Sequence, residues 1–322
     1  MKASAKARFD ELWRLLSSPE QLDPGTSPLR TIFEGDARVL MSAGVLVPAS
    51  PRPTRGWFVP FSVVEEKPSG LRRRFIAWPK EKNLEDSYEA DVPLGHISAY
   101  LDVVWEEGAS NLDLKASFYQ VPLPEEARSA FRCRLDDGTL VELARLPMGY
   151  AASPELMQLL TSALAGVPTV VDAAFACPTA LKIHVWIDNV RIAGPLKAVE
   201  AWTRRVTQFA RDASVTIGES EVAVASYTFV GVFFDHATHT VRLGEKTWRH
   251  LRETPPFEEM TVGDLEVFTS RAIYGAAVLG VRLFRNYMFL KFVRRQLSSL
   301  NRGKITTRSK ITMTPYIRGF RV

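Results

Sequence analysis

Two acidic residues at the tips of apolar segments are the side chains of this sequence best suited to chemistry. Asp113 lies at the end of a short predicted strand, residues 110–114, and Asp188 lies in the acidic turn between predicted strands at 182–188 and 190–193. Carboxylate oxygens are hard ligands of the kind that Mg²⁺ takes. An acid in such a place is also a common turn former, so either residue alone gives little support for catalysis.

The elements around these acids alternate between strands and helices without the regular spacing of a doubly wound sheet. Apolar runs at 58–64 and 72–78 predict two strands joined by a polar tip, and runs at 227–234 and 240–243 predict a last hairpin. A proline near its first turn predicts a helix at 154–165. The expected fold class is therefore α+β.

The size and composition are those of an ordinary globular protein. The chain has 322 residues, of which 46% are hydrophobic and 24% are charged, and this balance excludes wholesale disorder, collagen and coiled coil. No apolar run reaches the roughly 18 residues of a membrane span, and residues 1–14 lack the apolar core of a signal peptide. Cys133 and Cys177 make neither a disulfide framework nor a zinc site. We therefore expect an intracellular protein, cytoplasmic or nuclear, not secreted and without a membrane partner.

The positive charge of the chain is concentrated near its C-terminal end. The formal net charge is +5, yet residues 291–322 carry nine Lys and Arg and no acid, which leaves fewer bases than acids elsewhere. A basic segment on a slightly acidic body indicates contact with a polyanion, most often a nucleic acid. A solubilising or disordered tail would have the same composition, and charge alone does not separate the two interpretations.

The segments around the two acids, taken in order, resemble the reverse transcriptases of retroelements. The first catalytic motif of that family resembles LDLKASFYQVPL, around Asp113, and the second resembles RLPMGYAASPELMQ. Where the family has an aromatic residue, any residue and two aspartates, this chain has VWIDNVRIAG, around Asp188. The fingers segment is similar to residues 41–75, and the primer-grip hairpin is similar to YTFVGVFFDHATHTVRL. Matches cover residues 33–243. Within the family they most resemble the enzymes of long-terminal-repeat or VIPER/DIRS-like retrotransposons.

The resemblance implies a right-hand polymerase fold with fingers, palm and partial thumb. Residues 267–297 are expected to be largely helical and to belong to the thumb. Further polyprotein domains (RNase H, recombinase or integrase) are possible outside this chain. The expected divisions are an N-terminal helix and linker at 1–32, fingers with the start of the palm at 33–112, palm with a second part of the fingers at 113–245, a thumb-like helical region at 246–300 and a basic tail at 301–322.

The activity that the resemblance implies is that of an RNA-directed DNA polymerase of a retrotransposon. Such an enzyme adds deoxynucleoside triphosphates to the 3′-hydroxyl of a primer on an RNA or DNA template, by nucleotidyl transfer with two Mg²⁺ or Mn²⁺ ions. By resemblance, Asp113, Asp188 and Asn189 are the catalytic residues. The implied metal ligands are Asp113, Asp188 and the backbone carbonyl of Leu114.

The resemblance also implies which residues contact the substrate. Lys67 and Arg74 match the fingers hairpin that pairs with the triphosphate, and Phe118, five residues after Asp113, matches the aromatic gate that excludes a 2′-hydroxyl. Gly149 and Gln158 would flank the templating base pair. Other interpretations stay open, because Phe118 suits a hydrophobic core and Arg74 belongs to a charged run that solvent alone would accommodate.

Three departures from the family bear on catalysis. Asn189 replaces the second aspartate of the turn, which removes one negative charge from the expected metal site. The loop at 213–219 lacks the lysine that serves as a candidate general acid, and Trp186 replaces a tyrosine but keeps an aromatic ring. Two alternatives therefore accompany the polymerase. One is a catalytically decayed or domesticated reverse-transcriptase-like protein that binds nucleic acid, and the other is a scaffold with no affinity for Mg²⁺ or a primer–template.

Overall fold

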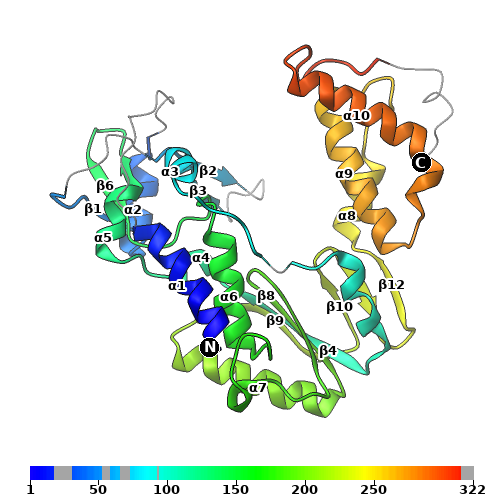
Figure 1. The fold of residues 1–322 in the computed structure, drawn as a ribbon, viewed down its shortest axis with the longest axis horizontal. Coiled ribbons are helices and arrows are strands. Elements are labelled where there is room, and N and C mark those ends of the chain that lie inside the picture. The colour runs from blue at the N-terminus through cyan, green and yellow to red at the C-terminus, as the bar shows by residue number, and fades with distance from the viewer. Residues whose placement is uncertain (18–30, 53–58, 66–72, 93, 313–322) are drawn as a thin grey trace. The chain divides into compact units, whose positions relative to one another are not determined.

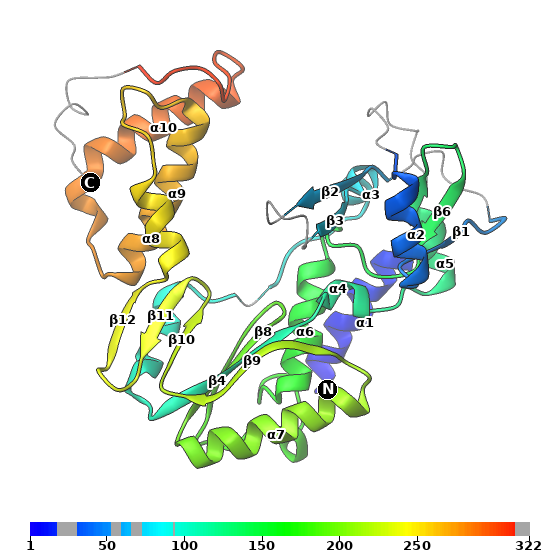
Figure 2. The ribbon, with the colours of Figure 1, turned by 180° about the vertical axis from the view of Figure 1, so that it is seen from behind.

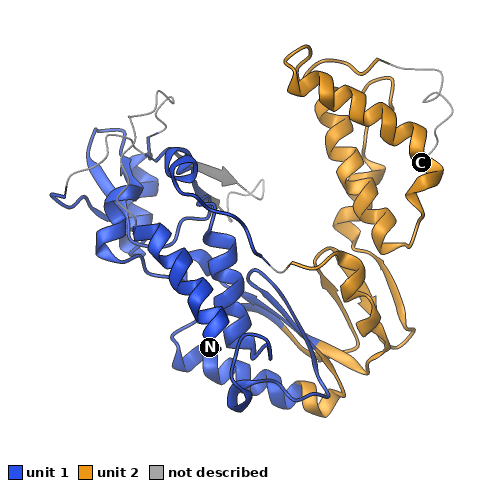
Figure 3. Ribbon diagram, in the orientation of Figure 1, with its two compact units in different colours: residues 1–93, 110–192, 200–220 blue, residues 94–109, 193–199, 221–322 orange. Residues whose placement is uncertain are grey.

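The structure is a computed structural model. It contains both helices and strands, as the expected α+β class requires. Two compact units make up the chain (Figure 3). Of residues 61–65, 73 and 74 only the backbone is described. The described residues are 1–17, 31–52, 59–65, 73–92 and 94–312. Unit 1 comprises 1–93, 110–192 and 200–220, and unit 2 comprises 94–109, 193–199 and 221–322.

Unit 1 begins with short helices and small antiparallel sheets (Figure 1). Helix α1 buries Leu12 and Leu16, which lie one turn apart on one face, as their spacing predicts. The chain leaves α2 through Gly44, whose φ of +66° is the left-handed conformation that ends many helices. In chain order these elements are α1 (Ala3–Ser17), α2 (Glu34–Ser42), β1 (Leu46–Pro48), β2 (Phe61–Glu65), β3 (Arg73–Ala77) and α3 (Lys80–Glu85).

The predicted hairpin of 58–64 and 72–78 is present in unit 1, and a second hairpin, β5–β6, lies near it in the chain. Strands β2 and β3 pair antiparallel, with Phe61 opposite Ala77. A second sheet has the order β1-β6-β5, and its hairpin turns at Gly138, where φ is +89°. The elements of this region are α5 (Glu125–Arg128), a 3₁₀ turn (Ser129–Phe131), β5 (Arg132–Arg134) and β6 (Leu140–Leu143).

A four-stranded sheet carries the two acids. Its strand order is β7-β8-β4-β9, so β4 lies between β8 and β9 (Figure 2). The prediction of a loop at 213–219 is wrong in part, because strand β9 begins inside this stretch. Its middle residues are exposed and polar, so it lacks the apolar alternation that marks a strand. The strands are β4 (Gly108–Leu114), β7 (Lys182–Trp186), β8 (Asn189–Gly194) and β9 (Ile217–Val224).

Helices α6 (Ser153–Ala165) and α7 (Leu196–Asp212) contact each other and this sheet. Helix α6 starts with a proline in its first turn, as predicted, and ends at Gly166, with φ of +79°. A side chain at Gly166 would lie 2.6 Å from the ring of Trp202, so the end of α6 can be this close to α7 only with glycine. The indole N–H of Trp202 donates to the carbonyl of Ala165 at 3.0 Å. On α7, the hydroxyl of Thr203 donates to Ser110 of β4 at 2.8 Å.

Unit 2 contains a three-stranded antiparallel sheet where the sequence predicts a simple hairpin. The prediction of one strand over 227–234 is wrong, because a two-residue turn at Val230 and Gly231 divides it. Both turn residues have positive φ, the conformation that suits a tight hairpin. Valine seldom takes that conformation, so it gave no turn signal. The elements are two 3₁₀ turns (Ile97–Tyr100 and Asp102–Trp105), β10 (Ser226–Phe229), β11 (Val232–Asp235) and β12 (Thr240–Leu243).

The rest of unit 2 is helical, but residues 267–297 do not form one continuous helix. The chain breaks after Val278, and Gly280 takes a φ of +65° before the next helix starts. Beyond it, Ile311 packs into the core formed by these helices, so the described part of the basic tail is ordered there. The elements are α8 (Glu245–Arg252), α9 (Val262–Val278), a 3₁₀ turn (Leu283–Asn286) and α10 (Tyr287–Asn301).

Neither a membrane span nor a disulfide is among the described features. In the parts of the chain that the structure describes, no helix combines the length and the apolar character needed to cross a bilayer. Cys133 and Cys177 are both buried and unbonded to each other. Burial raises the pKa of the Cys133 thiol to about 12, so this side chain stays protonated and acts as a small apolar core residue.

Candidate active site

The end of β4 and the turn between β7 and β8 lie against each other. The backbone N–H of Leu114 donates to the carbonyl oxygen of Asp188 at 3.1 Å. On the other side, the N–H of Lys115 donates to the carbonyl of Thr216, also at 3.1 Å. The residue next to Asp113 is thus bonded to Asp188 itself. Two acids that are 75 positions apart in the sequence are neighbours in the sheet.

The carboxylate of Asp188 accepts hydrogen bonds from two side chains. The hydroxyl of Ser117, at the start of α4 (Ser117–Gln120), donates to its Oδ2 at 2.9 Å. The side-chain amide of Asn189 donates to its Oδ1 at 3.1 Å. Each carboxylate oxygen therefore accepts one hydrogen bond from the protein, and a carboxylate has lone pairs left for a further partner. Ser117 is a residue that the sequence analysis missed, although it lies inside the first motif.

The turn that presents Asp188 is a strained one, and Gln158 of α6 holds it. Ile187 has a φ of +57°, a conformation that is costly for a β-branched residue. The side-chain oxygen of Gln158 accepts the N–H of Ile187 at 2.7 Å, and its amide N–H donates to the carbonyl of Val185 at 3.1 Å. Gln158 is only 4% exposed. The amide expected beside the templating base pair is thus bonded to the hairpin backbone.

A charged network fixes α6 against α1. Arg8 donates to both oxygens of Glu155, with its Nε at 2.6 Å and its Nη2 at 2.9 Å. Glu155 also accepts the hydroxyl of Tyr88 and the backbone N–H of Asp91. Burial alone would raise the pKa of Glu155, but these hydrogen bonds, led by that from Arg8, outweigh it and lower the pKa. No sequence signal links Arg8 to a carboxylate 147 positions away.

Gly149 lies where no side chain would fit, because the backbone of β3 is too close to it. An added Cβ would lie 2.0 Å from the carbonyl oxygen of Ala77, at the end of β3. The side chain of Asn83 fixes the same loop, because it donates to the carbonyl of Gly149 at 3.0 Å and accepts from the N–H of Ala151 at 2.8 Å. The second motif is thereby attached to the β3–α3 segment.

Phe118 follows the turn that leads out of β4. Ala116 takes a φ of +48° there and directs the chain into α4. Phe118 is 8% exposed and belongs to the hydrophobic core of unit 1. Its neighbour Tyr119 donates to the carbonyl of Phe75, on β3, at 2.6 Å. The ring of Phe118 therefore has core packing on most of its surface, which is the alternative that the sequence left open.

Two of the residues expected to bind the triphosphate are described little or not at all. Lys67 lies outside the described residues. Arg74 is described only by its backbone, which pairs with Val64 in the β2–β3 hairpin. No contact of either side chain can therefore be assigned, and their part in binding stays a prediction.

The oxygen atoms that the resemblance assigns to this site are of the kind that a hard cation takes. The carboxylates of Asp113 and Asp188 and the carbonyl of Leu114 are all oxygen ligands, which is the set that Mg²⁺ and Mn²⁺ prefer. Within the described ranges, no group of three or more His, Cys, Asp or Glu side chains is arranged to hold a metal ion. The residues present fit the chemistry of such an ion, with one carboxylate fewer than a turn of two aspartates would supply.

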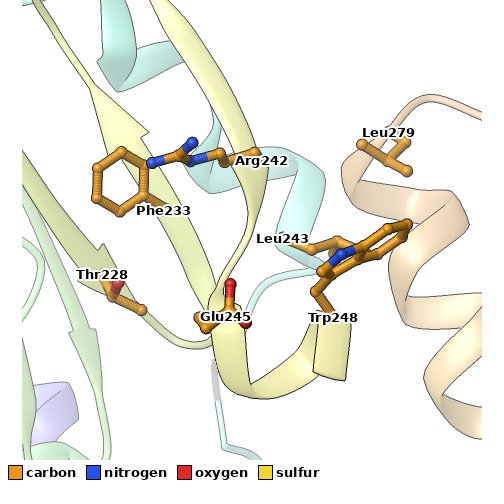
Figure 4. A pocket seen from close by; sticks show the side chains of 7 residues that line it. All are labelled: Thr228, Phe233, Arg242, Leu243, Glu245, Trp248 and Leu279. Carbon is orange, nitrogen blue, oxygen red and sulfur yellow. The ribbon is translucent and has the colours of Figure 1, made fainter. Parts of the chain in front are cut away.

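Unit 2 has a cavity of its own on the three-stranded sheet (Figure 4). The guanidinium of Arg242 lies over the ring of Phe233, 4.2 Å from its centre, so a cation and an aromatic ring form one wall. Trp248, from α8, is 45% exposed and lines the cavity as well. The cavity measures about 650 Å³. Flat aromatic walls can stack against planar groups, and Arg242 and Glu245 place one positive and one negative side chain beside them.

Comparison with known proteins shows that the fold of this chain is similar to that of solved structures. No protein-family model matches the chain, and no curated protein matches it. Three solved structures of a foamy viral protease-reverse transcriptase superpose on nearly all of it. One is a dRH form with double-stranded DNA, with a TM-score of 0.61, 15% identity, and coverage of 98% of this chain and 55% of that one.

The other two structures are of the same kind. The one in complex with double-stranded DNA has a TM-score of 0.59 and 14% identity, covering 99% of this chain and 66% of that chain. The one with an RNA/DNA hybrid has a TM-score of 0.57 and 15% identity, covering 99% and 43%. The chain thus spans about half the length of the solved chains that it matches. At these identities the likeness concerns the fold, and the chain has a reverse-transcriptase-like fold.

Proposed function

We propose that this chain is the polymerase part of a retrotransposon reverse transcriptase, an RNA-directed DNA polymerase that extends a primer with deoxynucleotides. The observation that carries the proposal is the hydrogen bond from the N–H of Leu114 to the carbonyl of Asp188, at 3.1 Å. This bond brings the end of β4, which carries Asp113, next to the turn that carries Asp188. The two acids belong to separate motifs. The likeness of fold supports the proposal, although a fold alone does not fix a function.

In this proposal residues 33–112 form the fingers with the start of the palm, residues 113–245 the palm with a second part of the fingers, and residues 246–300 a thumb-like helical region. Asp113, Asp188 and the carbonyl of Leu114 would hold two Mg²⁺ or Mn²⁺ ions. When bound, such ions activate the primer 3′-hydroxyl and offset the charge of the triphosphate. The type of element, long-terminal-repeat or VIPER/DIRS-like, rests on the motif resemblance.

The protein's own groups have separate tasks in this proposal. Ser117 and Asn189 orient the carboxylate of Asp188 through its two oxygens, and Gln158 keeps the turn in its strained conformation. Lys67 and Arg74 would neutralise the triphosphate, because cations there stabilise charge as it develops. Rigid placement of this kind lowers the cost of reaching the reactive geometry.

The surface of unit 2 is suited to the nucleic acid partner. The cavity beside Phe233 and Arg242 lies on the hairpin that resembles the primer grip, and base stacking with phosphate attraction is the usual way to hold a single strand. On α10, Arg294 and Arg295 are exposed and could contact phosphates of a template–primer duplex without reading its sequence.

A second function is favoured by one specific contact. The amide of Asn189 donates a hydrogen bond to Asp188, so this side chain supplies a donor where a second aspartate would supply a negative ligand. A chain with the weaker site could bind a primer–template without extending it. This alternative is a catalytically decayed or domesticated reverse-transcriptase-like protein.

Extension of a DNA primer on an RNA template separates the two functions. The wild type, Asp188→Ala and Asn189→Asp would be compared in Mg²⁺ and in Mn²⁺, with Asp172→Ala, an exposed acid outside the site, as the matched control. We expect extension by the wild type and by Asp172→Ala, none by Asp188→Ala, and faster extension by Asn189→Asp.

Other outcomes decide against the polymerase. Extension by Asn189→Asp alone would identify a protein disabled at one ligand. If no variant extends the primer while the duplex still binds with a steep dependence on salt, the protein is a nucleic-acid binder and the catalytic assignment fails.

A further inference from the structure

Strand β9 lies beside β4 in the sheet, and the start of β9 contacts the backbone next to Asp113. The N–H of Lys115, two residues after Asp113, donates to the carbonyl of Thr216 at 3.1 Å. A Cβ added at Gly218 would lie 3.4 Å from the carbonyl oxygen of Asp113 and 3.3 Å from the Cβ of Lys115. A shift of β9 along β4 would therefore also move the backbone that presents the acid.

Burial does little to fix the place of β9. It is an edge strand of the four-stranded sheet, and its residues 218–222 are exposed. The register of a strand is weakly specified where neither face is well buried. The turn that leads into β9 holds Ser214 at a φ of +57°, a conformation that is uncommon for a residue other than glycine. The place of β9 on β4 therefore depends on polar contacts more than on packing.

The side-chain amide of Gln120, which is half-buried, supplies such contacts. Its Oε1 accepts the N–H of Thr216 at 2.7 Å, and its Nε2 donates to the carbonyl of Thr216 at 3.0 Å. One amide thus pairs with both backbone groups of one residue, as a hydrogen-bonded residue of an adjacent strand would. The same Nε2 donates to the carbonyl of Lys115 at 2.6 Å, so the amide joins the start of β9 to the end of β4.

Helix α4, which carries Gln120, is bonded to the strand ends of both acids. Ser117, the first residue of the helix, donates to the carboxylate of Asp188. Gln120, its last residue, bonds the segment that follows Asp113. One helical turn therefore connects the two parts of the candidate active site that are far apart in the sequence.

We propose that Gln120 is a positioning residue of the candidate active site, which fixes the register of β9 on β4 and thereby holds the backbone that presents Asp113. It acts through two backbone segments and not by contact with a substrate. Gln158 has the matching part at Asp188, whose turn it holds. The effect of Gln120 on catalysis rests on the proposed function, whereas its effect on the register does not.

Hydrogen exchange followed by mass spectrometry tests the register without any need for activity. Gln120→Met keeps the length of the side chain and removes its amide, and Gln208→Met, at an exposed position of α7, is the matched control. We expect the backbone N–H groups of residues 113–117 and 214–220 to exchange about three- to tenfold faster in Gln120→Met, as for the loss of about one net hydrogen bond. Gln208→Met should exchange there as the wild type does. Unchanged exchange in Gln120→Met would overturn the proposal.

Primer extension separates a positioning role from a purely structural one. Groups that orient metal ligands typically change metal affinity by about 10–100-fold. Because Gln120 acts through the backbone, we expect a smaller change, in which the Mg²⁺ concentration that gives half the maximal rate rises about three- to tenfold in Gln120→Met. Partial unfolding would lower the rate and leave this concentration unchanged.

The two experiments together distinguish the possible failures. Faster exchange in Gln120→Met with an unchanged dependence on Mg²⁺ would mean that Gln120 is a structural residue only, and would overturn its positioning role. If the wild type itself does not extend the primer, the proposed function fails, and the exchange rates alone decide whether Gln120 holds the backbone at Asp113.

Discussion

Gln158 accepts the backbone N–H of Ile187 at 2.7 Å, and so the helix of the second motif holds the turn of the third. The left-handed conformation of Ile187 would be costly without such support, because the branched side chain crowds the backbone. Asp188 is the next residue, and its carbonyl accepts from Leu114. Three motifs that are separate in the sequence are therefore joined by two hydrogen bonds at one turn.

The first prediction concerns this support. Gln158→Met keeps the length of the side chain and removes both hydrogen bonds, which leaves the N–H of Ile187 and the carbonyl of Val185 unpaired. We expect a loss of about 2–4 kcal/mol in the free energy of unfolding, since each buried unpaired group costs about 1–3 kcal/mol. Chemical denaturation followed by circular dichroism measures it.

The matched control for Gln158→Met is Gln208→Met. Gln208 is exposed on α7, and its side-chain amide donates to Asp212, an exposed neighbour one turn away. Its replacement should change the free energy of unfolding by no more than about 0.5 kcal/mol. Equal losses in the two variants would mean that the turn does not depend on Gln158.

The second prediction concerns the close contact at Gly149. In Gly149→Ala the new Cβ would lie 2.0 Å from the carbonyl of Ala77, so the loop or β3 must move. We expect a loss of at least about 2 kcal/mol, in the range of overpacked sites. In the control Gly218→Ala the nearest atom would be 3.3 Å away, and the loss should be smaller. Comparable losses from thermal unfolding would show that the contact is not rigid.

The third prediction concerns acid stability. The pKa of Glu155 is lower in the folded chain than its ordinary value of 4.5, so the folded state binds fewer protons than the unfolded state in that range. The stabilisation from its partners is therefore complete above about pH 4.5 and is lost as the pH falls through the folded pKa. The slope of unfolding free energy against pH should steepen below pH 4.5 in the wild type.

Glu155→Gln serves as the reference for that titration. The variant cannot ionise, so its stability should be lower than that of the wild type at pH 7, by about 1.5–3 kcal/mol for lost charged hydrogen bonds. The difference between the two proteins should narrow as the pH falls. Parallel stability curves between pH 3 and pH 7 would contradict a lowered pKa for Glu155.

The sequence predicted what depends on local pattern. Strands around an acidic turn located the β7–β8 hairpin, and a proline near its first turn located helix α6. The ordered motifs indicated the fold and the two acids. Local pattern failed where a residue adopts a backbone conformation that its type disfavours. Val230 at positive φ divided a predicted strand, and Ile187 at positive φ needs a partner from another element.

The remaining features of the site depend on contacts between distant positions. Arg8 and Glu155 form their ion pair only where α1 packs against α6. The sequence around either residue does not predict this pair. Gln158 belongs to a motif, yet its two hydrogen bonds to the hairpin follow from the packing of α6 against β7. Sequence periodicity reports which face is buried and leaves open which polar groups meet there.

The last prediction separates the two interpretations of Phe118. As a core residue that is 8% exposed, it should contribute to stability, and Phe118→Leu should cost about 1 kcal/mol. As a gate beneath the sugar, it should exclude ribonucleotides, and the same variant should incorporate them more readily in primer extension. Phe131→Leu is the matched control, because Phe131 is fully buried in the same core and should lower stability alone. If both variants lose stability and neither gains ribonucleotide incorporation, Phe118 is a core residue and the selection of deoxynucleotides lies elsewhere.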